Sequence, residues 1–263
     1  MIKLIACDLD GTLLDDNKKL DSKIFDVVEK LKEKGIIFTV ISGRNEELLS
    51  FYIDELNIDY PYVVNNGGNI YQNHKCLKNI CIPKEYNNFL AKTLYENDIV
   101  FKLFSIEGTY YHSTSDFFEA RMKEFAFEQT EYKPNLDLSN LNIYKITSDY
   151  NTHLDRFEKV YKRIVGNCPE IVYLRADKNV YCINSKLANK GYGLEYLCEL
   201  LNIDIKDTMV FGDNGTDISM FEKAKIAVIV NNAQDDIKKY ADYICKDNNN
   251  HGVSDFIREY FNI

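Results

Sequence analysis

Residues 2–14 read IKLIACDLDGTLL. The apolar run at residues 2–7 is short and nearly continuous, which is typical of a strand buried on both faces in a parallel sheet. The run stops at Asp8-Leu9-Asp10-Gly11-Thr12, where a glycine follows two closely spaced carboxylates. Because glycine permits a sharp turn, we expect a buried strand whose carboxyl end presents Asp8 and Asp10.

The segments that follow alternate between helix and strand patterns. Apolar residues recur at helical spacing between residues 24 and 31, after an N-cap at Asp21 or Ser22. Residues 36–41 then have the pattern of a second strand, and residues 62–64 that of a third. Strand, helix and strand at this spacing predict a right-handed crossover and a parallel sheet.

The same alternation returns near the end of the chain. Strand patterns occur at residues 208–211, 226–230 and 243–245, with apolar helical stripes at residues 194–201 and 256–260. We therefore predict that the two ends of the chain form one α/β core with a parallel, Rossmann-like sheet.

The middle of the chain has a different order of helix and strand patterns. Residues 100–106 and 109–112 are strand patterns separated by Glu107-Gly108, which favours a hairpin. Further strands are expected at residues 142–147, 171–175 and 180–184, and helices at residues 86–95, 117–127 and 154–164. We predict an inserted α+β domain at residues 82–185 and a core formed by residues 1–81 and 186–263.

Composition narrows the function classes. The chain has 263 residues, 45% of them hydrophobic, and a net charge of -9, which opposes binding to nucleic acid. Its 7 scattered cysteines indicate a reducing compartment. The sequence shows neither a signal peptide nor an apolar run long enough to cross a membrane. We expect a soluble cytoplasmic protein that is not bound to a membrane.

Polar residues stand where the predicted strands end. In open parallel sheets, ligands bind beyond the carboxyl ends of the strands. One of the carboxylates of Asp8 and Asp10 can attack phosphorus while the other carries a proton. Ser42 and Gly43 end the second strand with a hydroxyl and backbone N–H groups suited to a phosphoryl oxygen, and Arg44 is a weaker candidate for gripping phosphate.

The second half of the chain adds a cation and further carboxylates. Lys190 precedes a helix, where its ammonium would offset the repulsion between Asp8 and a phosphoryl group. Residues 212–217 read GDNGTD and place Asp213 and Asp217 after a strand. Hard oxygen ligands from Asp8, Asp213 and a backbone carbonyl suit Mg²⁺.

The sequence lacks the residue patterns of several other kinds of catalytic or binding site. None of the cysteines has the arginine spacing of a cysteine phosphatase, and no Gly-Lys pair supports a nucleotide-binding P-loop. The glycines do not fit a dinucleotide fingerprint, and the four histidines make no zinc pattern. A calcium-binding EF-hand loop starting at Asp213 would require Glu where Ala224 stands.

Taken together, the motifs DLDGTLL and GDNGTD, with Ser42 and Lys190 between them, resemble those of the haloacid-dehalogenase superfamily, specifically its Cof-like phosphatases with a type IIB cap. The resemblance covers the whole chain and identifies residues 82–185 as the cap. It implies a Mg²⁺-dependent phosphatase that acts on small soluble phosphate monoesters through an aspartyl-phosphate.

The resemblance also implies a role for each matching residue. Asp8 is the nucleophile, Asp10 the general acid and base and, through its carbonyl, a metal ligand. Ser42, Gly43 and Arg44 bind phosphate or substrate, Lys190 stabilises charge and contacts phosphate, and Asp213 binds the metal. Asp217 and Asn214 support the metal shell, and Asn232 is a supporting residue.

This sequence departs from the family pattern at Thr216, where Asn is usual, and at Asn231, where Gly is usual. Neither position supplies a nucleophile, proton carrier or metal ligand, so activity is expected to survive. Two alternatives stay open: a sugar phosphomutase, and a non-catalytic regulator that binds a phosphometabolite. In the cap, Tyr110, Tyr111, Tyr173 and Tyr181 are candidates for stacking on a substrate, although core packing is the commoner use of tyrosine.

Overall fold

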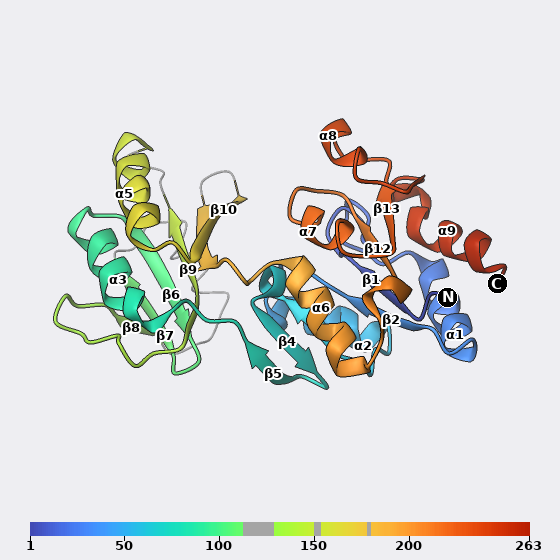
Figure 1. The fold of residues 1–263 in the computed structure, drawn as a ribbon, viewed down its shortest axis with the longest axis horizontal. Helices are drawn as coiled ribbons and strands as arrows, with labels where there is room; N and C mark the ends of the chain where they lie inside the picture. Colours follow the sequence, from blue (N-terminus) through green and yellow to red (C-terminus); the bar gives the residue numbers. More distant parts are fainter. Residues whose placement is uncertain (113–128, 150–153, 178–179) are drawn as a thin grey trace. The chain divides into compact units, whose positions relative to one another are not determined.

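The computed structural model describes residues 1–112, 129–149, 154–177 and 180–263. The chain divides into two compact units (Figure 1). The core unit comprises Met1–Asn79 and Ala188–Ile263, and the inserted unit comprises Ile80–Leu187.

The core unit contains a five-stranded sheet with the order β14-β13-β12-β1-β2, in which every pair is parallel. Its strands are β1 (Leu4–Cys7), β2 (Ile37–Val40), β12 (Thr208–Gly212), β13 (Ile226–Val230) and β14 (Tyr243–Cys245). The two ends of the chain thus meet at the β1–β12 pair. The predicted parallel α/β core is confirmed.

Helices cover both faces of this sheet. They are α1 (Ser22–Glu33), α2 (Glu46–Glu55), α6 (Lys190–Leu201), α7 (Ile218–Phe221), α8 (Asp235–Lys238) and α9 (Gly252–Phe261), with 3₁₀ turns η1 (Asn65–Gly67), η3 (Ile205–Asp207) and η4 (Asn248–Asn250). Ile5 packs with the apolar residues of α1, α2 and α9, whereas Leu4 packs with those of α6, α7 and α8. Because alternate residues of β1 enter two different cores, the strand reads as a continuous apolar run.

A second, antiparallel sheet belongs to the same unit. It comprises β3 (Tyr62–Val64), β4 (Asn69–Gln72) and β5 (Lys75–Asn79). The strand expected at residues 62–64 is confirmed, and it has neighbours of both kinds: it is bridged in parallel to Ile41 and pairs antiparallel with β4. Besides this bridge, the backbone N–H of Ser42 donates to the carbonyl of Val63 at 2.9 Å, and the turn after β3 folds the chain back onto β4.

The inserted unit has a six-stranded sheet with the order β10-β11-β9-β6-β7-β8. Its elements are η2 (Lys84–Tyr86), α3 (Asn87–Glu96), β6 (Val100–Ser105), β7 (Thr109–His112), β8 (Gln129–Glu131), β9 (Ile143–Asp149), α5 (Leu154–Asn167), β10 (Ile171–Asp177) and β11 (Val180–Ser185). The predicted hairpin is the β6–β7 pair. The helix expected at residues 117–127 lies outside the described residues.

Alternating residues divide this sheet into two faces. Phe101, Leu103, Ile146 and Ile183 form one apolar cluster with residues of α3 and α5. The alternate positions, including Lys102 and Thr147, point to the opposite face. The inserted unit therefore has an α+β architecture with its own core.

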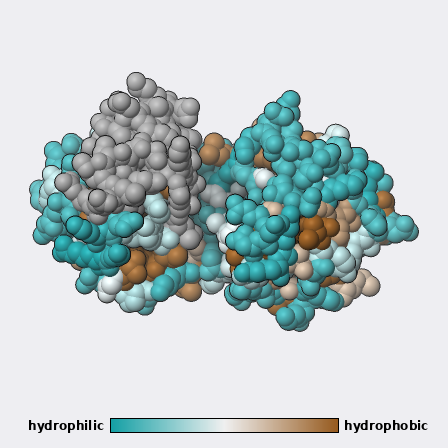
Figure 2. Space-filling view, turned by 90° about the horizontal axis from the view of Figure 1, so that it is seen from above, coloured by the Kyte–Doolittle hydropathy of each residue, from teal (hydrophilic) through white to brown (hydrophobic). Residues whose placement is uncertain are grey.

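The surface and the cysteines add two observations. Described residues exposed in Figure 2 are mainly hydrophilic, with hydrophobic residues in small separate groups. All seven cysteines are free thiols. Within the part of the chain that the structure describes, no helix has both the length and the apolar character needed to cross a bilayer.

Candidate active site

Asp8 follows the central strand β1 at its carboxyl end. Its backbone N–H donates to the carbonyl of Phe211 on β12 at 2.9 Å, which continues the parallel pairing one residue beyond the strand. The residue is only 3% exposed. The sheet thus holds a carboxylate in an almost water-free position, where a charge needs partners.

Lys190, the first residue of α6, supplies the main partner. Its Nζ donates to Asp8 Oδ1 and to Asp217 Oδ1, both at 2.5 Å, and Lys190 is 1% exposed. Burial lowers the pKa of Lys190, but the charges of Asp217 and Asp8 outweigh burial and raise it. The lysine therefore stays charged and ties the ends of β1 and β12 to the start of α6.

Glycines allow α6 to begin at this place. A Cβ on Gly67, whose φ is +96°, would lie 2.1 Å from the carbonyl oxygen of Asn189, the N-cap of α6. A Cβ on Gly191 would lie 2.2 Å from the carbonyl oxygen of Ser219. Because both contacts are with backbone, any side chain at either position would displace the start of α6 and move Lys190.

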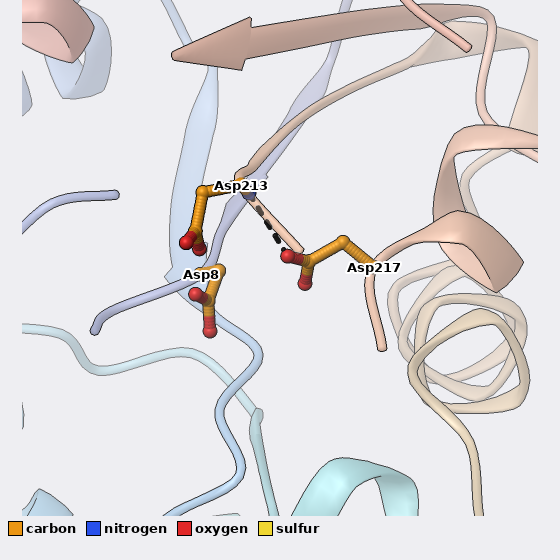
Figure 3. Close-up of side chains that lie close together, drawn as sticks. All are labelled: Asp8, Asp213 and Asp217. Carbon is orange, nitrogen blue, oxygen red and sulfur yellow. Dashed lines mark hydrogen bonds between the residues drawn. The ribbon is translucent and has the colours of Figure 1, made fainter. Parts of the chain in front are cut away.

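The loop after β12 brings two more carboxylates to the same place (Figure 3). Asp217 is fully buried, and its Oδ2 accepts hydrogen bonds from the backbone N–H groups of Asp213 and Asn214, each at 3.0 Å. Since its Oδ1 is bonded to Lys190, both oxygens of Asp217 are used by protein donors. This arrangement orients the loop and leaves Asp213 as the more accessible carboxylate.

The donor set fits a divalent cation. Asp8, Asp213 and Asp217 each have a carboxylate oxygen within 4.8 Å of the others. Burial raises the pKa of both Asp8 and Asp213, and the neighbouring carboxylates raise it further against the opposing effect of Lys190. Three carboxylates facing one ammonium leave an excess of negative charge, and hard oxygen ligands are those that Mg²⁺ prefers.

Thr12 connects the first and last motifs, a role that the sequence analysis missed. Its hydroxyl lies 3.0 Å from Asp213 Oδ1 and 3.4 Å from Asp8 Oδ2. Gly11 lies beside it at φ +80°, and a Cβ there would approach Asp213 Oδ2 to 2.7 Å. The Gly-Thr pair after Asp10 was a signal for a turn, but the partner 201 positions away was not visible in the sequence.

Asp10 points to a different set of charges. Arg44 donates to both of its carboxylate oxygens, from Nε and Nη2, each at 2.7 Å, and Lys18 Nζ donates to Oδ1 at 2.9 Å. Partial burial would raise the pKa of Asp10, but Arg44 and Lys18 outweigh burial and lower that pKa to about 2. The candidate proton carrier is thus held as a carboxylate between two cations.

Ser42 and Gly43 lie at the end of β2, next to β1. Ser42 is 1% exposed, and its Oγ accepts the backbone N–H of Arg44 at 3.1 Å. Gly43 is exposed and lies so close to Asn66 that a Cβ would approach its Oδ1 to 2.9 Å. The carboxyl ends of β1 and β2 therefore bring these residues to the same edge of the sheet as Asp8.

Two asparagines fix the loop that follows Asp10. Asn232 Nδ2 donates to the carbonyl of Gly11 at 2.7 Å, and the backbone N–H of Asn248 donates to Asn232 Oδ1 at 3.1 Å. Asn248 Nδ2 donates in turn to the carbonyl of Leu14 at 2.9 Å and to Asp16. Asn232 and Asn248 thus join the loop after Asp10 to the segments that follow β13 and β14.

The departure from the family pattern at Thr216 is accommodated locally. Thr216 donates from its N–H and its hydroxyl to Asn214 Oδ1, at 2.9 and 2.6 Å. Asn214 Nδ2 reaches Asp213 Oδ1 at 3.3 Å. Thr216 therefore remakes a hydrogen bond beside the acidic cluster through Asn214.

The sequence of this chain matches a known protein family. The family model described as haloacid dehalogenase-like hydrolase matches residues 5–257. This chain belongs to that family. The resemblance seen in the motifs is therefore confirmed, together with the fold.

Members with named activities align along nearly the whole chain. One is 5-amino-6-(5-phospho-D-ribitylamino)uracil phosphatase YwtE of Bacillus subtilis, 24% identical over 97% of both chains. Another is phosphoglycolate phosphatase of Methanobrevibacter smithii, 25% identical over 98% of both chains. Phosphoric monoester hydrolase is the enzyme class that the family match and these relatives support.

A solved structure gives the same fold. The subclass IIB sugar phosphatase BT4131 superposes with a TM-score of 0.80 at 22% identity, covering 99% of this chain and all of the other. At this identity the likeness establishes the fold alone. This haloacid dehalogenase-like hydrolase thus combines a parallel-sheet core with an inserted cap.

Proposed function

We propose that this hydrolase cleaves small, soluble phosphate monoesters in the cytoplasm through an aspartyl-phosphate formed on Asp8. One observation carries the proposal: the buried carboxylate of Asp8 shares the ammonium of Lys190 with Asp217, and Asp213 lies beside it. A nucleophilic carboxylate must approach a phosphate dianion, and charge compensation of this kind reduces their repulsion.

The reaction has two displacements. Asp8 attacks phosphorus, the bond between phosphorus and the ester oxygen breaks, and Asp10 in its protonated form gives a proton to the departing oxygen. The hydrogen bonds from Arg44 and Lys18 favour the carboxylate form of Asp10 that this step leaves, which is the form needed as a base. Water then attacks the acyl phosphate and gives its proton to Asp10, which releases phosphate and restores Asp8. Ser42 and the backbone at Gly43 bind the phosphoryl oxygens, and Arg44 holds Asp10 in place between turnovers.

We assign a Mg²⁺ site to Asp8, Asp213 and the backbone carbonyl of Asp10. The ion would supply positive charge that favours the ionised form of Asp8 and offsets the charge of the phosphate. Asp217 and Asn214 orient Asp213 from behind. Turnover should cease when EDTA removes the metal, and full activity in protein shown by elemental analysis to be metal-free would reject this assignment.

We also propose that the inserted unit, approximately residues 82–185, selects the leaving group. The named substrates of the relatives share a phosphate ester and differ in the remainder of the molecule. A common chemistry in the core and a variable second unit account for that pattern. The substrate class that we propose is therefore a small phosphorylated metabolite.

Rapid-quench kinetics with p-nitrophenyl phosphate test the roles of the two aspartates. Asp8→Asn should form no phosphoenzyme, since an amide is a far weaker nucleophile. Asp10→Asn should give a burst followed by slow turnover, because nitrophenolate leaves with little protonation whereas the acyl phosphate still needs a base. A stoichiometric burst from Asp8→Asn, or normal steady-state turnover by Asp10→Asn, would overturn the assignment.

A further inference from the structure

Two cationic side chains surround the single carboxylate of Asp10. Arg44 grips both oxygens of Asp10, and Lys18 adds a third hydrogen bond. Two positive charges against one negative charge leave a local excess of positive charge. This excess lies two residues along the chain from Asp8, where the surrounding groups leave an excess of negative charge.

Hydrogen-bond donors also remain available on both cations. An ammonium carries three N–H donors, and among the contacts of the described residues Lys18 Nζ uses one, toward Asp10. Among the hydrogen bonds of the described residues, Arg44 Nη1 makes a long one of 3.4 Å, to the carbonyl of Leu48. The Lys18 side chain is 56% exposed, so a ligand can reach it.

One largely buried side chain organises both cations. The ring of Tyr52, which is 9% exposed, lies 4.9 Å from the guanidinium carbon of Arg44, and its hydroxyl donates to the backbone carbonyl of Lys18 at 3.0 Å. Lys18 itself has φ +62°, a left-handed conformation that favours glycine or asparagine. The turn maintains this conformation, because the Lys18 N–H donates to the carbonyl of Asp15 at 3.0 Å, and it directs the side chain toward Asp10.

We propose that Lys18 and Arg44 form an anion subsite for a second acidic group, a carboxylate, on the leaving-group side of the substrate. The carboxylate of Asp10, which both cations bind, shows that their geometry suits a carboxylate. Asp8 and Asp10 are two residues apart, so their Cα atoms are separated by at most about 7 Å. Lys18 Nζ lies 2.9 Å from Asp10 Oδ1, so in this proposal the leaving group of a small ester bound at Asp8 lies on the side of Asp10. This subsite rests on the proposed function and restricts it to carboxylated phosphate esters.

Binding of two inert phosphonates tests the subsite without turnover. 3-Phosphonopropionate and propylphosphonate differ only in a carboxylate and a methyl group, and their affinities are measured by calorimetry with Mg²⁺ present. The wild-type protein should bind the carboxylated compound about tenfold more tightly, since a charge-assisted hydrogen bond is worth at least this factor. Lys18→Met and Lys18→Gln should abolish the preference.

Lys19→Met is the matched control, because Lys19 is the exposed neighbour and its side chain does not share the ion pair with Asp10 among the described contacts. This variant should keep the tenfold preference. Equal affinities in the wild-type protein, a preference that survives both Lys18 variants, or no binding of either compound would overturn the subsite. Turnover of p-nitrophenyl phosphate in the same preparation decides separately whether the phosphatase proposal stands.

Discussion

The two main sheets of this hydrolase place polar residues in different ways. In the core unit every strand of the five-stranded sheet runs in the same direction, so the loops after β1, β2 and β12 meet at one edge. In the inserted unit neighbouring strands mostly alternate in direction, and successive strand ends lie at opposite edges. Residues there come together through the alternation of side chains across one face.

This difference has an energetic counterpart. At the core edge, Asp8, Asp217 and Lys190 are almost completely buried and depend on one another for charge compensation. On the inserted sheet, Lys102 and Thr147 are cross-strand neighbours on the face opposite an apolar core, and the Thr147 hydroxyl donates to the Lys102 carbonyl at 3.4 Å. Substitutions should therefore be more strongly coupled at the core edge, where three buried charges compensate one another, than between Lys102 and Thr147.

The largest effect is expected from Lys190→Met. The change leaves two buried carboxylates without their ammonium, so turnover should fall by about a thousandfold and the free energy of unfolding by about 3–5 kcal/mol. Steady-state kinetics and urea unfolding measure the two quantities. Lys206→Met, at an exposed lysine of the same unit, is the control and should change neither. Turnover within tenfold of wild type would contradict the role of Lys190.

A smaller effect is expected from Asn248→Ala. Its side chain donates to Leu14 and Asp16 in the loop that follows Asp10. Losing these bonds should lower kcat about tenfold with KM nearly unchanged, because the loop that orients the reacting groups is loosened. Unfolding should become easier by about 1–3 kcal/mol.

Asn250→Ala provides the matched control in the same turn. Asn250 Nδ2 contacts only Asp247 among the hydrogen bonds of the described residues, and both side chains are exposed. Its kcat and stability should stay near those of the wild-type protein. A larger loss of kcat in Asn250→Ala than in Asn248→Ala would show that the network does not position the loop.

The geometry of the sheets explains what sequence reasoning recovered in the core. Strand ends in a parallel sheet share one edge, so the order of Asp8, Ser42, Lys190 and Asp213 along the chain was enough to predict that they gather. The motifs also carried the family resemblance. Individual contacts were missed, since nothing near Thr12 or Asn248 in the sequence indicates that they contact Asp213 and Leu14.

The errors have equally physical causes. The antiparallel pairing of residues 62–64 with β4 was not foreseen, because their apolar run is compatible with either kind of pairing and only the positions of β4 and β5 reveal the second sheet. Arg44 and Lys18 were not expected to meet at Asp10, because long cationic side chains usually extend into solvent. Such choices depend on tertiary contacts that local pattern does not encode.

Tyr110 and Tyr111 offer an intermediate test on the inserted sheet. Tyr110 packs against the apolar cluster with α3 and α5, as do Tyr173 and Tyr181. The side chain of Tyr111 points to the other face of the sheet, where Lys102 of β6 is its cross-strand neighbour. We expect Tyr110→Ala to lower stability by about 2–4 kcal/mol with little change in substrate preference.

The companion variant Tyr111→Ala should do the reverse. It should change the ratio of kcat/KM between two phosphate esters by roughly threefold to tenfold and leave the urea midpoint almost unchanged. A substrate screen with both variants separates the effects. If Tyr110→Ala alone altered the preference, the assignment of the two faces would be reversed.

The smallest effect is expected in the antiparallel sheet of the core unit, away from the acidic cluster. His74, in the turn between β4 and β5, contacts Glu46 at 2.9 Å and Asp54 at 2.9 Å. Hydrogen bonds to Glu46 and then Asp54 raise the pKa of His74 above its ordinary value of 6.5.

A raised pKa fixes the sign of the pH dependence. The protonated histidine is favoured in the folded state, so its contribution to stability is complete below about pH 6.5 and is lost as the pH rises through the higher folded value. The side chain is 45% exposed, and exposed ion pairs contribute less than about 1 kcal/mol. Urea unfolding between about pH 5.5 and 8.5 should show wild type gaining up to this amount over His74→Gln at the acidic end. The free energies of unfolding of the two proteins should converge at the alkaline end. If the advantage of the wild-type protein instead grew with pH, His74 would be neutral in the folded state. Burial, rather than the two carboxylates, would then govern its titration.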